Sequence, residues 1–283
     1  MRFVRYDDGG TARVGVMRGD AIVPLTSLAD KYPTMMSIIE GGDEALAAVH
    51  SAVDAETATV PFDKATLLAP IERPGKYLAI GMNYAKHLDE ADRLGVARSD
   101  HQVWFNKQTT CLNDPFADVD PGVTEKLDYE VELGAVIGKT AKSVSKEDAS
   151  SYVFGYFVAN DFSARDWQFH SPTFTMGKSF DTHGPIGPWI ITADEVADPH
   201  NLDLRCYVND ELRQSSNTSL LLSNLWEQIN YLSTAFTLDP GDLIATGTPE
   251  GVAAGMDNPV FLKAGDVVRC EIDGIGTIEN KII

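Results

Sequence analysis

The sequence predicts a strand-rich α+β fold, and three observations lead to this class. Short apolar runs with β-branched residues recur along the chain, separated by turns of glycine, proline and aspartate. Helical periodicity is confined to a few segments. Strands do not alternate regularly with helices, as a doubly wound parallel sheet requires. The 283 residues suffice for one large domain with a small one beside it.

The first domain is expected over residues 1–70, as a small β-rich unit. Its turns are rich in aspartate and glycine, and two helices are expected between its strands. No residue in this part suggests a reactive site, so a structural role follows. The expected strands are residues 2–6, 13–17, 21–25 and 66–70, and the expected helices are 35–40 and 43–53.

The second domain is expected over residues 71–283, after a linker with two prolines and a glycine at 70–75. A helix should begin near Asn83, a capping residue, and end at Gly95. A longer helix over 224–236 carries a capping-box start and one apolar stripe. The expected strands are 76–81, 103–107, 127–138, 156–162, 189–192, 202–208 and 211–214, with a short helix near 146–152, a rigid loop at 184–188, and hairpin turns at 209–210 and 273–274.

Charge and cysteine content exclude several classes of protein. With 42 acidic and 23 basic residues, the net charge of −19 opposes binding to nucleic acid or to an anionic membrane. No apolar run is long enough to span a bilayer, and the N-terminus lacks a signal core. Three widely spaced cysteines (Cys111, Cys206 and Cys270) show no metal-ligand spacing. A protein of a reducing compartment, the cytoplasm, is expected.

Three carboxylates suggest a metal site. Glu130 and Glu132 are two apart in a strand-like run, so both point to one face. Asp161 interrupts another apolar run, where a charge is rarely buried unless it is paired or metal-bound. Oxygen ligands without cysteine select a hard cation, Mg²⁺ first and Mn²⁺ or Ca²⁺ next. The alternative is three unrelated surface acids among 42.

Other polar residues are candidates for acid–base chemistry and substrate binding. His87 and Glu90 are three apart on an expected helix, where a carboxylate can fix the tautomer of the imidazole, although such pairs also occur on solvated faces. Lys178 follows a glycine in an apolar run and could stabilise an enolate, or be an ordinary surface lysine. The candidates for binding a substrate carboxylate are Lys107, Arg165, Gln168 and Thr248.

Taken in order, several short motifs resemble one known family. They are Gly81-Met82-Asn83-Tyr84-x-x-His87-x-x-Glu90, Glu130-x-Glu132-Leu133, Asn160-Asp161-x-x-x-Arg165-Asp166, Gly177-Lys178-Ser179-Phe180, Gly184-Pro185-Ile186-Gly187-Pro188 and Thr246-Gly247-Thr248-Pro249-x-Gly251-Val252. From Lys76 to the C-terminus the chain resembles the fumarylacetoacetate hydrolase superfamily, and within it the acylpyruvate, fumarylpyruvate and maleylpyruvate hydrolases. Walker A, GxGxxG and GxSxG motifs are absent from the sequence.

The resemblance implies a β-roll or sandwich-like catalytic domain in a homodimer. It implies Mg²⁺ or Mn²⁺ bound by the three carboxylates, with His87 and Glu90 as a water-activating dyad on a lid. It also implies Lys178 as the enolate-stabilising lysine. The positions that it implies for substrate contact are Arg165, Gln168 and Thr248, to which we add Tyr84 and Lys107.

The implied activity is hydrolysis of the C–C bond of a β-diketo acid, such as fumarylpyruvate or maleylpyruvate, in the catabolism of aromatic compounds. The substrate would be a small anionic keto acid, and pyruvate would be one product. Related chemistries remain open: oxaloacetate decarboxylation, keto-diacid isomerisation and diketo-deoxy sugar acid hydrolysis. A non-catalytic metal- or ligand-binding relative is the alternative outside enzymes. Residues 105–108 depart from the Phe-x-Lys-Pro pattern of acylpyruvate hydrolases, which leaves the distal group of the substrate open.

Overall fold

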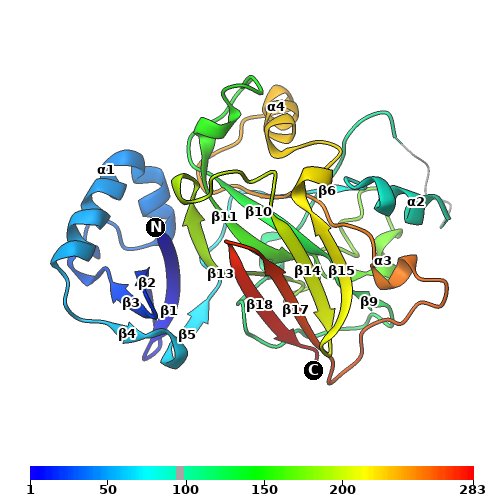
Figure 1. The fold of residues 1–283 in the computed structure, drawn as a ribbon, viewed down its shortest axis with the longest axis horizontal. Coiled ribbons are helices and arrows are strands. Elements are labelled where there is room, and N and C mark those ends of the chain that lie inside the picture. Colours follow the sequence, from blue (N-terminus) through cyan, green and yellow to red (C-terminus); the bar gives the residue numbers. More distant parts are fainter. Residues whose placement is uncertain (94–98) are drawn as a thin grey trace.

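The computed structural model describes residues 1–93 and 99–283, with the backbone alone for 91–93. Within these residues, twelve strands form one mixed sheet and four more form a second sheet in front of it (Figure 1). The N-terminal unit lies at one end of the molecule, and the helix that carries His87 lies at the opposite end (Figure 1). This strand-rich α+β architecture confirms the fold class expected from the sequence.

The N-terminal strands extend the large sheet instead of forming a sheet of their own. Strand β1 (Arg2–Asp8) pairs with β13 (Gly184–Thr192), where Arg2 lies opposite Ile191. Helix α1 (Met35–Ala55) is broken at Gly42, whose φ of 54° is not helical, in agreement with the two helices expected here. The strands of this unit are β1 (Arg2–Asp8), β2 (Thr11–Arg18), β3 (Ala21–Pro24), β4 (Val60–Pro61) and β5 (Thr66–Leu68).

The centre of the large sheet carries the site. Its strands are β13 (Gly184–Thr192), β11 (Val153–Asn160), β10 (Val131–Ile137), β16 (Leu243–Ala245), β6 (Tyr77–Gly81) and β7 (Val103–Asn106), in this spatial order, with β8 (Leu112–Asn113) beside β13. The loop expected at 184–188 is wrong, because these residues are the first half of β13. Ile186 pairs with Ala159, and a register shift accommodates the stretch that contains Pro188.

The second sheet and helix α4 cover one face of β10 and β11. The sheet has the order β15 (Glu211–Asn217), β14 (Asp203–Val208), β17 (Val267–Ile272) and β18 (Gly276–Lys281). Asn209 and Asp210 both have positive φ, which suits the tight hairpin expected there. Helix α4 (Leu225–Ala235) begins with the capping box of Asn224 and Glu227, as the sequence indicates. Its residues Leu225, Ile229 and Leu232 are buried in the core.

Strand β10 separates two cores because its side chains alternate between faces. Val131 and Leu133 pack under the second sheet, whereas Val136 belongs to the core beneath α1. The strand expected over 127–138 is interrupted, since the N–H of Glu130 donates to the side chain of Asn160. Two strands result, β9 (Leu127–Asp128) and β10, and β9 pairs with β12 (Ser163–Ala164).

Short helices complete the surroundings of the site. Helix α2 (Ala85–Arg93) carries His87 and Glu90, and α3 is Arg165–Gln168. Gly95, expected to end α2, lies outside the described residues. The short helix expected near 146–152 is a 3₁₀ turn at Ala149–Tyr152, and further 3₁₀ turns occur at Thr26–Leu28, Phe62–Lys64, Thr109–Cys111, Ala193–Glu195, Thr218–Leu220 and Ala253–Gly255. None of the helices in the described residues is long and apolar enough to cross a membrane.

The base of α2 is fixed differently from the sequence-based expectation. The side chain of Asn83 does not cap the helix: its amide donates to the carbonyls of Ser223 and Thr246, at 2.9 and 2.8 Å. Its oxygen accepts a hydrogen bond from the N–H of Ser223. Asn83 therefore ties the start of α2 to two distant segments, and so places the helix at the edge of the large sheet.

Candidate active site

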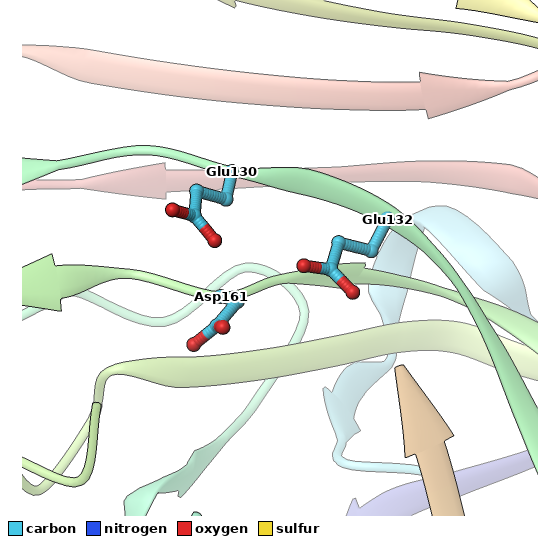
Figure 2. Close-up of side chains that lie close together, drawn as sticks. All are labelled: Glu130, Glu132 and Asp161. Carbon is cyan, nitrogen blue, oxygen red and sulfur yellow. The ribbon is translucent and has the colours of Figure 1, made fainter. Parts of the chain in front are cut away.

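Glu130, Glu132 and Asp161 converge on one point. Each offers a carboxylate oxygen, and these oxygens all lie within 4.8 Å of one another in a buried position. Figure 2 shows Glu130 and Glu132 on one strand segment and Asp161 on its neighbour, with the carboxyl groups in the space between. The N–H of Asp161 donates to the carbonyl of Glu130 at 2.9 Å, which fixes the register of the two segments. The structure thus brings together the three residues chosen from the sequence.

Basic side chains neutralise two of the three carboxylates. Lys178 Nζ lies 2.6 Å from Glu130 Oε2 and 2.8 Å from Asp161 Oδ2. A nitrogen of Arg165 lies 2.7 Å from Glu130 Oε1, and Lys107 Nζ lies 2.5 Å from Asp161 Oδ1. Burial alone would raise the pKa of Glu130, but Lys178 and Arg165 outweigh it and lower the pKa to about 2. Glu130 is therefore ionised at neutral pH.

Glu132 differs from the other two carboxylates because it has no ion-pair partner among the described residues. Its Oε2 accepts a hydrogen bond from the N–H of Gly247 at 2.7 Å, and the described residues place no basic side chain in an ion pair with it. Burial, together with Asp161 and Glu130, raises its pKa well above the ordinary value. Three converging carboxylate oxygens, one of them on a residue without a basic partner, fit a hard divalent cation. Mg²⁺ and Mn²⁺ both meet this requirement, and the structure does not distinguish them.

Close packing at a glycine places Lys178. A Cβ on Gly177 would lie 2.3 Å from Gln168 Cα and 2.6 Å from the carbonyl oxygen of Ala164, so no larger residue fits there. The carbonyl of Gly177 accepts a hydrogen bond from the N–H of Ala164 at 2.8 Å. The next residue is thereby directed at the carboxylates, with its ammonium 5.0 Å from the centre of the Phe105 ring.

His87 and Glu90 form a pair on α2. His87 Nδ1 lies 2.9 Å from Glu90 Oε2, and the other oxygen of Glu90 accepts the N–H of Gly251 at 2.9 Å. The contact is tight, because a Cβ on Gly255 would lie 2.5 Å from the carboxyl carbon of Glu90. When Nδ1 carries its proton toward Glu90, Nε2 of His87 is left to exchange a proton with a ligand. Residues 251–255 thus hold the pair in place.

One cavity of about 370 Å³ is lined by Glu130 and Lys178 and also by the His87–Glu90 pair. Its wall is largely apolar, with a few convergent polar groups, as is typical of a small-molecule site. The lining residues are Ile80, Gly81, Met82, His87, Glu90, Phe105, Lys126, Glu130, Arg165, Gln168, Phe169, Phe174, Lys178, Thr248, Val252, Ala254, Pro259 and Phe261. Three of the expected substrate contacts, Arg165, Gln168 and Thr248, are among them.

Two expected substrate contacts lie elsewhere. Lys107 is 2% exposed. Its ammonium donates to Asp161 and to the carbonyls of Lys178 and His183, so it contacts the carboxylate cluster from the protein interior and not from the cavity. Tyr84 is 1% exposed, and its hydroxyl has no hydrogen-bond partner among the residues that the structure describes. Neither residue lines the cavity, since both side chains point into the protein interior.

Asp128 is a further polar residue of the site, which we did not select from the sequence. It is fully buried, accepts from Arg165 Nε at 2.8 Å and accepts from the N–H groups of Ala253 and Ala254 at 2.8 and 3.0 Å. It thus connects Arg165 to the segment that holds α2. The signal was available, because Asp128 precedes Glu130 by two residues, as Glu130 precedes Glu132.

Both parts of the chain match models of known protein families. Residues 76–283 match the C-terminal model of fumarylacetoacetate hydrolase, and residues 1–70 match a model described as Rv2993c-like, N-terminal. The oxaloacetate tautomerase FAHD2B, mitochondrial, of Bos taurus is 41% identical, over 94% of this chain and 85% of its own. Its counterpart fahd2 in Xenopus laevis is 40% identical, over 100% of this chain and 90% of its own.

Solved structures of the same family match the whole chain. A fumarylacetoacetate hydrolase from Exiguobacterium antarcticum is 35% identical, with a TM-score of 0.86, covering 100% of this chain and 99% of its own. A maleylpyruvate hydrolase from Sphingobium sp. SYK-6, solved with manganese(II) and pyruvate, is 34% identical, with a TM-score of 0.83 and the same coverage. On these matches, with the strand-rich fold and the buried carboxylates that accompany them, the chain belongs to the fumarylacetoacetate hydrolase family.

Proposed function

We propose that this protein is a divalent-cation-dependent enzyme that moves a proton on the carbon beside the keto group of a short 2-keto acid. Oxaloacetate is the first candidate substrate, and keto–enol tautomerisation the first candidate reaction. One observation carries the proposal: Glu130 of the carboxylate cluster, Lys178 and the His87–Glu90 pair line a single cavity, with Glu132 and Asp161 buried beside Glu130. The names of relatives about 40% identical, oxaloacetate tautomerases, support the choice of substrate.

The cation would be held by Glu130, Glu132 and Asp161, whose oxygens provide three ligands of the hard type. When bound, such a cation supplies positive charge that stabilises developing negative charge on a keto-acid oxygen. Mg²⁺ and Mn²⁺ are both proposed. The manganese in the related maleylpyruvate hydrolase supports this choice.

The chain's own residues account for the movement of the proton. His87, held through Nδ1 by Glu90, takes the proton from carbon with Nε2. The ammonium of Lys178 hydrogen-bonds the oxygen that becomes negative, which stabilises the enolate. That oxygen then takes a proton from water, the hydroxide left behind takes the proton from Nε2 of His87, and the enol is complete with His87 neutral again. In the reverse direction His87 returns a proton to carbon.

Hydrolysis of the C–C bond of an acylpyruvate is the second candidate function. The His87–Glu90 pair favours it, because an imidazole oriented by a carboxylate can take a proton from water as readily as from carbon. The water would attack the distal carbonyl, the C–C bond would break, and the pyruvate enolate would take up a proton. The related maleylpyruvate hydrolase, solved with pyruvate, supports a keto-acid ligand. Decarboxylation and keto-diacid isomerisation need the same enolate.

Two assays of the Mn²⁺-loaded protein separate these candidates. The first follows the decay of enol-oxaloacetate, with Mn²⁺ alone as the control, and the second follows pyruvate release from oxaloacetate, fumarylpyruvate, maleylpyruvate and acetylpyruvate. We expect ketonisation to be faster than with Mn²⁺ alone and to stop with a chelator. A rate equal to that of free Mn²⁺ would contradict the tautomerase proposal, and pyruvate release from an acylpyruvate would favour the hydrolase. The homodimer and the cytoplasmic location remain predictions.

A further inference from the structure

Lys126 is a basic residue of the cavity to which neither the proposed chemistry nor the sequence-based selection assigned a role. It immediately precedes strand β9, and its side chain is exposed where it lines the cavity. Its backbone is fixed on both sides: its N–H donates to Thr124 Oγ1 at 3.1 Å, and its carbonyl accepts the N–H of Arg165 at 3.0 Å. The ammonium is thus carried by a fixed backbone at the rim of the cavity.

The other lysine and arginine in the cavity wall are already engaged. Each of the three guanidinium nitrogens of Arg165 lies within 3.0 Å of a protein oxygen, on Asp128, Gln168 and Glu130. The ammonium of Lys178 contacts Glu130 and Asp161. A ligand that carries a second anionic group would find both of them occupied by protein carboxylates.

Lys126, in contrast, forms no ion pair within residues 1–93 and 99–283. It adds to the electrostatic field at Asp166, but that carboxylate already accepts the hydroxyl of Thr124 and the N–H of Glu125. In a protein with a net charge of −19, a lysine that forms no ion pair in the described structure and lies at the rim of a ligand cavity is available to an anionic ligand.

The wall of the cavity is apolar at Phe169, Phe174, Val252 and Phe261. Such a wall accommodates hydrocarbon but provides no partner for a charge. A ligand whose keto-acid end meets Lys178 therefore has Lys126 as its one unengaged lysine or arginine in the cavity wall, among the described residues. The arrangement fits a molecule with an acidic group at each end and a short carbon chain between.

We propose that Lys126 binds the distal carboxylate of the substrate and so selects 2-keto diacids over 2-keto monoacids. This inference rests on the proposed function, because it assumes that the keto-acid end binds near Lys178. The pair would be partly solvated, so its contribution to selectivity is about fivefold in Kd, the upper range for exposed ion pairs. The contribution should fall as ionic strength rises.

Calorimetric titration of the Mn²⁺-loaded protein tests the proposal. The ligands are oxaloacetate, 2-oxoglutarate and 2-oxoadipate, each compared with the monoacid of the same chain length. The measured quantity is the ratio of the monoacid Kd to the diacid Kd. For the best-fitting length we expect a ratio of about 5 in the wild type, falling to near 1 in Lys126→Met.

Lys263 provides a matched control. It is exposed, it adjoins Leu262, which pairs with Leu127, and it does not line the cavity. Lys263→Met makes the same change in net charge close by, so an equal effect of both variants would indicate a general field and would overturn the proposal. An unchanged ratio in Lys126→Met, or no diacid preference in the wild type, would also overturn it. If the wild type bound none of the six acids, the proposed function itself would fail.

Discussion

The floor of the cavity and the helix above it are held by different kinds of contact. The floor, our name for Glu130, which lines the cavity, with Glu132 and Asp161 buried beside it, lies on two adjacent chain segments and is surrounded by buried basic groups and backbone N–H groups. Helix α2 is held instead by separate polar contacts: Asn83 at its base, an ion pair of Lys86 with Glu250, and Glu90 at residues 251–255. The difference teaches that the proposed cation site and the proposed proton-transfer pair belong to separately held parts of the structure. Variants should therefore separate them.

Replacing Glu132 by Gln should have the largest combined effect, because it should lower both Mn²⁺ affinity and turnover through a change in the floor alone. The amide oxygen can still accept the N–H of Gly247, but the charge that a cation requires is gone. We expect Mn²⁺ affinity to fall by more than about 100-fold, the upper range for residues that merely support ligands. Turnover should fall by about 10³-fold. Calorimetric titration with Mn²⁺ and the enol-oxaloacetate assay measure the two quantities.

Glu125 supplies the control for this variant, since it is exposed and does not line the cavity. Glu125→Gln makes the same change of charge and should alter neither quantity. If Glu132→Gln retained the affinity of the wild type for Mn²⁺, Glu132 would not be a ligand, and the carboxylate cluster would lose its assigned role.

Replacing His87 by Gln should affect helix α2 and spare the floor. The variant lacks the nitrogen that exchanges a proton, so turnover should fall by about 10²- to 10⁴-fold, the usual contribution of a general acid–base group. Mn²⁺ affinity at pH 8 should stay at the wild-type value, because no bond joins His87 to the carboxylate cluster in the described structure. A parallel loss of Mn²⁺ affinity would show that the floor and helix α2 depend on each other.

The features that the sequence predicted correctly are those set by residues close together in the chain. Period-two alternation placed Glu130 and Glu132 on one face, and a charge within an apolar run singled out Asp161. These are local patterns, and the structure agrees with them. The caps of α4 and the Asn209–Asp210 hairpin are local as well, and both are present.

Long-range partners were beyond such patterns. Asn83 has the residue type of a helix cap, yet its partners Ser223 and Thr246 are 140 and 163 residues away. Lys107 was expected in the cavity, but its ammonium is drawn to Asp161, 54 residues further on. A local pattern indicates which face a side chain occupies, and only the assembled sheet determines which group it meets there.

Lowering the pH should destabilise the native protein through protonation of His183, whose carbonyl accepts a hydrogen bond from Lys107 beside the floor. Burial and the nearby ammonium of Lys107 lower the pKa of His183 to about 4, from 6.5 in the unfolded chain. Between these values the unfolded state binds more protons than the native state, so stability falls as pH falls from 6.5 toward 4. From pH 7 to pH 5 the loss is about 2 kcal/mol, about twentyfold in the unfolding equilibrium.

Denaturant unfolding of the metal-free protein at several pH values measures this loss. His183→Gln removes the titrating group and should flatten the dependence between pH 7 and 5, relative to the wild type. His50→Gln, at an exposed histidine, should leave the dependence as it is. Equal slopes in wild type and His183→Gln would show that the floor is not acid-sensitive at this residue.

Replacing Gly255 by Ala should have the smallest effect and should act only on Glu90 of helix α2. The new methyl group would lie 2.5 Å from the carboxyl carbon of Glu90, and relieving such overpacking costs about 1–3 kcal/mol. Displacing Glu90 frees Nδ1 of His87, so we expect about tenfold slower turnover with unchanged Mn²⁺ affinity. Glu90→Asp shortens the side chain and makes room for the methyl group. If the clash with Glu90 is the cause, Gly255→Ala should therefore add little to the loss already caused by Glu90→Asp, whereas additive losses would place the cause elsewhere.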